Sequence, residues 1–132
     1  SAEDFDHLGE LQEESERSVA REDMQGFTKA EIGLHSLILS SAKNGRLLKM
    51  IESIKDLTYT ERMMAVRSSN EVQREFSLQN LRAAVEEHRR IVDALRKRDG
   101  LGAGEAMRRH IRAVQGRLLA FLDLPETEAE AD

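Results

Sequence analysis

The feature that most constrains the fold is a pair of apolar stripes between residues 81 and 118, each with a histidine at its centre. Apolar side chains recur there every three or four residues, the spacing of one face of an α-helix. The first stripe surrounds His88 and comprises Leu81, Ala84, Val85, Ile91, Val92 and Leu95. The second surrounds His110 and comprises Ala103, Ala106, Met107, Ile111, Val114 and Leu118. The pattern predicts two helices that each turn an imidazole toward the core, where an unpaired polar group costs roughly 1–3 kcal/mol.

The first third of the chain predicts two more helices. Ser1 and Asp4 have the spacing of a capping box, so a first helix is expected over residues 1–22. Asp23 is then placed to cap a second helix that runs to about Ala42. One face of the second helix carries Phe27, Glu31, Leu34, His35, Ile38 and Ala42. The sequence thus places a carboxylate and an imidazole one turn apart among apolar neighbours.

A third helix is expected after the Asn44-Gly45 break, with Asn44 as its cap. Its inner face carries Leu47, Ile51, Ile54, Thr58, Arg62 and Ala65. An arginine on an inner face needs a carboxylate from the protein or from a ligand, because a buried unpaired charge is costly. Arg62 is therefore predicted to anchor a carboxylate ligand.

Glycines separate the last two helices. The fourth helix is expected to end near Arg98, and the three glycines in residues 99–104 predict a flexible hinge. The fifth helix then runs to about Leu122, and the acidic residues 123–132 predict a loose tail. The fold class expected is all-α, an antiparallel bundle of about five to six helices over residues 1–122.

Composition and charge narrow the class of protein further. The chain has no cysteine, which excludes disulfides and thiolate metal sites. Nothing resembles a signal peptide or a membrane span, so a cytoplasmic protein without a membrane partner is expected. More than half of the 25 acidic side chains lie in residues 1–23 and 123–132, which leaves residues 24–122 cationic. A cationic middle either suits a small anionic ligand or reflects solvated helix faces. Duplex DNA binding by this chain is not expected, since no recognition-helix pattern accompanies the charge.

Three of the four histidines lie at the centres of apolar stripes on three different helices, whereas His7 lies among acidic residues and has no predicted role. Taken alone, Glu31 and His35 have the spacing of a helix ion pair. His35, His88 and His110 facing one core, with Glu31 one turn from His35, favour a mixed nitrogen and oxygen site for a divalent cation. The bundle is therefore predicted to hold a central metal site.

Three segments resemble the motifs of a known family. Residues 31–35 (Glu-Ile-Gly-Leu-His) and 41–44 (Ser-Ala-Lys-Asn) are similar to the signature Asp-x-x-Phe-His followed by Ala-Ser-x-Asn. That signature belongs to the FadR-type C-terminal domain (FCD) of GntR-family bacterial transcription regulators. Residues 87–95 resemble the family's Glu-His-x-x-Ile-x-x-Ala-Ile segment. Its ending, Asp-x-x-x-Ala-x-x-x-Met-x-x-His, is similar to the run of Asp99, Ala103, Met107 and His110.

The resemblance implies an effector-binding and dimerisation domain over residues 1–122 that holds a divalent metal beneath a small-molecule pocket. The metal ligands that it implies are Glu31, His35, His88 and His110. Zinc is the expected ion, with nickel, manganese and iron as alternatives. Glu31 departs from the family's usual aspartate and is one methylene longer. Leu34 replaces the usual phenylalanine, which is a change in packing.

The resemblance also implies a place in a larger regulator. Members of the family normally begin this domain with one further helix, preceded by an N-terminal winged helix-turn-helix that binds DNA; neither is expected in this chain. A small organic acid bound at the metal and Arg62 would alter a homodimer, and through it the DNA binding of the intact regulator. The alternatives are a metal-dependent helical-bundle enzyme acting on a small carboxylate and a metal-free structural module. No catalytic residue is predicted, because no further general base accompanies the histidines.

Overall fold

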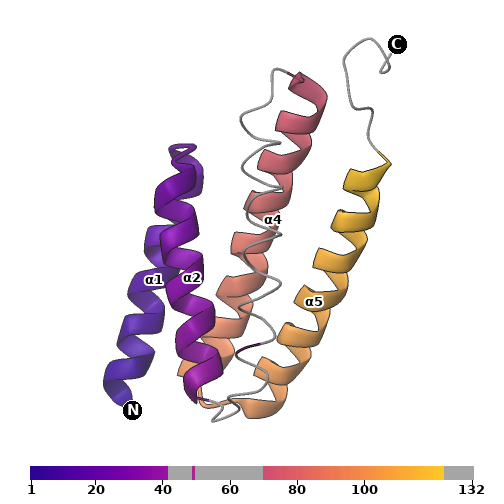
Figure 1. The fold of residues 1–132 in the computed structure, drawn as a ribbon. Coiled ribbons are helices and arrows are strands. Elements are labelled where there is room, and N and C mark those ends of the chain that lie inside the picture. The colour runs from indigo at the N-terminus through magenta and orange to yellow at the C-terminus, as the bar shows by residue number, and fades with distance from the viewer. Residues whose placement is uncertain (42–48, 50–69, 124–132) are drawn as a thin grey trace. The chain divides into compact units, whose positions relative to one another are not determined.

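The computed structural model describes residues 1–41, 49 and 70–123 and has four helices and no strand within them (Figure 1). The helices are α1 (Ala2–Ala20), α2 (Met24–Ser41), α4 (Glu71–Arg96) and α5 (Gly100–Leu122). The predicted all-α class is confirmed. The described residues contain fewer than the predicted five to six helices, since the third predicted helix falls mostly outside them.

The start of α1 has the predicted capping box. The backbone N–H of Asp4 donates to Ser1 Oγ (3.2 Å), and the Asp4 side chain accepts from the Ser1 backbone. The buried face of α1 then carries Leu8, Gly9, Gln12, Ser15, Ser18 and Val19. Small and polar side chains therefore occupy positions that a wholly apolar stripe would otherwise fill.

Two short joints of the same construction connect α1 to α2 and α4 to α5; they comprise residues 21–23 and 97–99. In each joint the second residue has a left-handed backbone, with φ of 55° at Glu22 and 57° at Arg98. The third residue, an aspartate, donates its backbone N–H to a carbonyl in the last turn of the preceding helix. This is the Schellman arrangement, which satisfies carbonyls that a helix end leaves open.

The same aspartates begin the next helices. Asp23 Oδ1 accepts from the backbone N–H of Gly26 (3.0 Å), and Asp99 Oδ1 accepts from that of Gly102 (2.8 Å). Both glycines leave room for the cap, because a Cβ there would collide with the aspartate carboxylate. The predicted flexible hinge at residues 99–104 is wrong: Asp99 caps α5, and the glycines lie in its first turns.

A side-chain cap also begins α4. Asn70 Oδ1 accepts from the backbone N–H of Gln73 (3.2 Å), and the helix starts at Glu71. Its buried face carries Ser77, Leu78, Leu81, Ala84, Val85, His88, Ile91 and Val92. The predicted stripe around His88 is confirmed except at Leu95, which is half-buried.

The chain divides into two compact units, Ser1–Met63 and Met64–Asp132. In the first unit α1 packs against α2 in the antiparallel direction. The two helices approach closely at Gly33, where an added Cβ would lie only 2.9 Å from the side chain of Leu11. In the second unit α4 packs antiparallel to α5 (Figure 1). No described helix is both long and apolar enough to cross a membrane. Each unit thus contains a helical hairpin, and each hairpin carries two of the predicted metal ligands.

Candidate metal centre

The two histidines of the apolar stripes face each other across the α4–α5 hairpin. His88 is completely buried, and His110 is 6% exposed. Their Nε2 atoms lie 3.0 Å apart, and the rings meet edge to face, with centroids 4.4 Å apart and planes at 69°. The hairpin therefore brings together two imidazoles that are 22 residues apart in the sequence.

The inner face of α5 is narrower than the sequence predicted. The stripe residues that remain buried or half-buried beside His110 are Ala103, Ala106, Met107 and Val114. Ile111 and Leu118 were predicted to share this stripe, but they are 58% and 41% exposed. Ile111 directly follows His110 and so lies about 100° further around the helix, on the flank of the face that packs against α4.

A carboxylate and a guanidinium group complete the site on the hairpin. His110 Nδ1 lies 2.6 Å from Glu87 Oε2. Arg117 donates to both oxygens of the same carboxylate, from Nη1 to Oε1 (2.6 Å) and from Nη2 to Oε2 (2.8 Å). The Glu87 and Arg117 side chains are largely buried, with exposed fractions of 15% and 18%. A continuous polar chain therefore runs from Arg117 through Glu87 and His110 to His88.

The charge on Glu87 determines which nitrogen of His110 carries a proton. Burial raises the pKa of Glu87, but hydrogen bonds from Arg117 and His110 outweigh that effect and hold this pKa below its usual value. The carboxylate is therefore ionised at neutral pH and can only accept hydrogen bonds. Since His110 Nδ1 must then donate to it, the neutral ring has a lone pair on Nε2.

This arrangement fits a nitrogen-binding metal ion. The space between the two Nε2 atoms suits either a proton donated by His88 or a cation bound by both rings. Two nitrogens bound to one zinc ion at about 2.0–2.1 Å lie roughly 2.8–3.4 Å apart for metal angles of about 90–109°. The observed separation of 3.0 Å lies within this range.

The other two predicted ligands lie on α2. His35 Nε2 is 3.7 Å from Glu31 Oε1, and the side chains are 22% and 18% exposed. This separation is that of an ion pair and is too long for a good direct hydrogen bond. The structure thus pairs Glu31 with His35 in one unit and His88 with His110 in the other. That all four bind one ion stays a prediction, and Arg62 lies outside the described residues.

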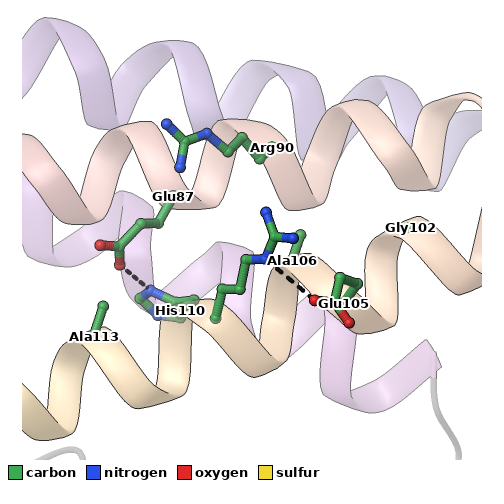
Figure 2. A pocket seen from close by; sticks show the side chains of 8 residues that line it. Glu87, Arg90, Gly102, Glu105, Ala106, His110 and Ala113 are labelled. Atoms are coloured by element: carbon green, nitrogen blue, oxygen red, sulfur yellow. Dashed lines mark hydrogen bonds and ion pairs between the residues drawn. The ribbon is translucent and has the colours of Figure 1, made fainter.

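A groove of about 350 Å³ lies between α4 and α5 beside the contact of Glu87 with His110 (Figure 2). It is lined by Glu87, Arg90, Gly102, Glu105, Ala106, Arg109, His110 and Ala113. Two guanidinium groups and two carboxylates balance each other there, and Arg109 is already paired with Glu105 (3.2 Å). The groove therefore borders Glu87 but does not by itself select an anion.

Glu87 and Arg117 were not predicted from the sequence as parts of the site. Arg117 lies two turns after His110 and so shares its face of α5, a spacing that could have indicated a role. Glu87 directly precedes His88, which places it on a different part of the α4 surface. Its contact with His110 depends on how α4 is aligned against α5, and no spacing within one helix encodes that alignment.

Comparison with known families gives one match. The model of the FCD domain matches residues 1–113, which include α1, α2, α4 and all four predicted metal ligands. Neither the curated proteins nor the solved structures contain a match to the chain.

Proposed function

The chain belongs to the FCD domain family, the effector-binding domains of GntR-family regulators, and we propose that it is the ligand-sensing domain of a bacterial transcription regulator of the FadR subfamily. FCD domains are regulatory domains of transcription factors, which favours sensing over catalysis. The proposed effector is a small organic acid. The proposed assembly is a cytoplasmic homodimer that contacts DNA through a separate winged helix-turn-helix.

The domain is further proposed to hold a divalent metal through Glu31, His35, His88 and His110. The observation that carries this proposal is the buried histidine pair, with Nε2 atoms 3.0 Å apart and a lone pair of His110 between them. Three imidazoles and one carboxylate suit zinc, and also nickel, manganese or iron when further positions are filled by water or a ligand. A bound cation would supply Lewis acidity toward the carboxylate of an organic acid.

Sensing requires that the effector favours one of two arrangements of the domain. Arg62 is the proposed second anchor, because a guanidinium group forms strong charge-assisted hydrogen bonds with a carboxylate. The effector shifts the balance only by the difference in its affinity for the two arrangements. The proposed consequence is a change in the spacing of the two DNA-binding modules of the dimer.

A metal analysis followed by a ligand screen tests this function. The chain is purified without added metal, its metal content is measured, and a thermal-shift screen is run with small mono- and dicarboxylic acids. We expect about one divalent ion per chain and at least one acid that raises the melting temperature, since a ligand at 100 times its Kd stabilises by about 2.7 kcal/mol. The same acid should have no effect after chelation.

Two results would contradict the proposal. A chain that carries no metal and takes up neither zinc nor nickel would remove the metal site. Chemical conversion of the acid by the purified chain would instead favour the metal-dependent enzyme.

A further inference from the structure

We propose that Glu87 and Arg117 are positioning residues for the metal ligand His110: Arg117 fixes the carboxylate of Glu87, and this carboxylate fixes the tautomer and orientation of the imidazole. The inference rests on the proposed metal site for its function. The tautomer of His110, however, can be measured on the metal-free chain.

The two ring nitrogens of His110 have different partners. Nδ1 lies 2.6 Å from a Glu87 oxygen, a short distance that is typical of a hydrogen bond to a charged acceptor. Nε2 lies 3.0 Å from Nε2 of His88. A carboxylate that accepts from one nitrogen of an imidazole leaves the other as the ligand and raises its basicity. Glu87 therefore selects Nε2 of His110 as the metal-binding atom.

Arg117 holds the Glu87 carboxylate in a fixed orientation. A carboxylate held by one hydrogen bond can rotate, whereas the two parallel bonds from a guanidinium group fix both of its oxygens. Arg117 also compensates the charge of a carboxylate that is only 15% exposed, and an unpaired charge at such a depth would be costly. Because Glu87 lies on α4 and the other two side chains on α5, the same contacts align the two helices at the histidine pair.

Glu105 provides a matched control on the same hairpin. Its carboxylate also accepts from two arginines, Arg108 (3.2 Å) and Arg109 (3.2 Å), and it lines the same groove. Its side chain is 52% exposed, and no histidine is among these partners. Glu105→Gln therefore removes a comparable negative charge without touching His110.

Zinc affinity, measured by competition with a chromophoric chelator, tests the positioning role. We expect Glu87→Gln to weaken zinc binding about 10- to 100-fold, the usual effect of removing a hydrogen-bond partner of a metal ligand. Arg117→Lys keeps the charge but not the paired bonds, so it should weaken binding by less. Glu105→Gln should bind zinc like the wild type. Unchanged affinity in both Glu87→Gln and Arg117→Lys, with helicity retained by circular dichroism, would overturn the role.

The imidazole nitrogen resonances of metal-free protein provide a second readout, recorded at a pH above the titration of the ring, where the imidazole is neutral. We expect His110 to carry its proton on Nδ1 in the wild type and in Glu105→Gln, and to lose this preference in Glu87→Ala. A wild-type His110 protonated on Nε2 would overturn the inference whatever the metal content. If the tautomer is as expected but the wild type binds no metal, the proposed function fails while the control of the ring by Glu87 stands.

Discussion

His88 and His110 are buried, and an imidazole loses more hydration free energy on burial than an apolar side chain would in the same position. Hydrogen-bonding partners compensate part of this cost: His110 has His88 on one side and Glu87 on the other. The Arg117 fork then compensates the buried carboxylate. A site of this kind is sensitive to single substitutions, since each removal leaves another buried polar group without its partner.

Replacing either core histidine should lower metal content and stability together. His110→Ala removes a proposed ligand and leaves the Glu87 carboxylate without one hydrogen bond, so we expect unfolding to become easier by about 1–3 kcal/mol. His88→Ala should act in the same direction. Metal content by mass spectrometry and melting temperature by circular dichroism give the measurements. His7→Ala is the control, because its side chain is 58% exposed. Metal content equal to that of the wild type in both core variants would show that the pair is not a ligand set.

Arg62→Ala should weaken binding of an organic acid and leave the metal in place. A charge-assisted hydrogen bond contributes about 1.5–3 kcal/mol, which corresponds to roughly a 10- to 150-fold higher Kd. Calorimetry with an acid found by the thermal-shift screen measures the change. Arg90→Ala is the comparison variant, because Arg90 is exposed in the groove beside His110 and is not predicted to bind the acid. The same Kd for wild type and Arg62→Ala would remove Arg62 from the ligand site.

At the level of the helices, the two joints explain how short connections reverse the chain. Each combines a left-handed residue, Glu22 or Arg98, with an aspartate that closes one helix and begins the next. Hydrogen bonds hold the backbone of each joint in this conformation, so the reversal of the chain does not require a flexible segment. The joint before α5 also sets where that helix begins, and therefore which of its side chains face α4.

Asp99→Ala should destabilise the α4–α5 hairpin. The substitution removes the N-cap of α5, and loss of such a cap typically costs about 0.5–2 kcal/mol, or a few degrees in melting temperature. Asp99→Asn should retain most of the stability, since asparagine caps about as well as aspartate. Asp93→Ala, at an exposed position within α4, controls for the lost charge. Thermal unfolding followed at 222 nm distinguishes the three variants, and equal losses in Asp99→Ala and Asp93→Ala would contradict the capping role.

For the molecule as a whole, α5 carries apolar side chains that are exposed among the residues that the structure describes. Ile111, Leu118 and Leu119 are 58%, 41% and 58% exposed, and their spacing of seven and eight residues places them along one side of the helix. Exposed apolar surface is unfavourable by about 25 cal/mol per Å² relative to burial. Pairing with a second copy would cover this side, in keeping with the proposed homodimer.

Sedimentation of the isolated chain should show a dimer at tens of micromolar. Leu119→Glu should shift the equilibrium toward monomer, because a charge would be buried in the contact. Leu101→Glu should have a smaller effect: Leu101, which is 88% exposed, lies on the same side of α5 as Leu119 but about 27 Å away along the helix, close to the joint. A wild-type monomer, or a dimer that Leu119→Glu leaves intact, would exclude pairing through this side of α5.

Several features were determined by the sequence alone because they depend on neighbours within a turn or two. The capping box of Ser1 and Asp4, the cap at Asp23 and the buried stripe around His88 all lie where the spacing predicted. Glu31, His35, His88 and His110 were selected from the same spacing, and their motifs identified the family that the comparison then showed. Helix periodicity and caps are local interactions, so a local pattern predicts them.

How the α4–α5 hairpin completes the site depends on the packing of the two helices and could not be predicted from the sequence. The rotation of α5 left Ile111 and Leu118 exposed and turned Arg117 toward Glu87. The contact of Glu87 with His110 joins two helices at one particular alignment. Such an alignment results from the packing of all side chains between the helices together with the backbone of the joint. Its partners are distant in sequence, so the periodicity of either helix alone leaves it undetermined.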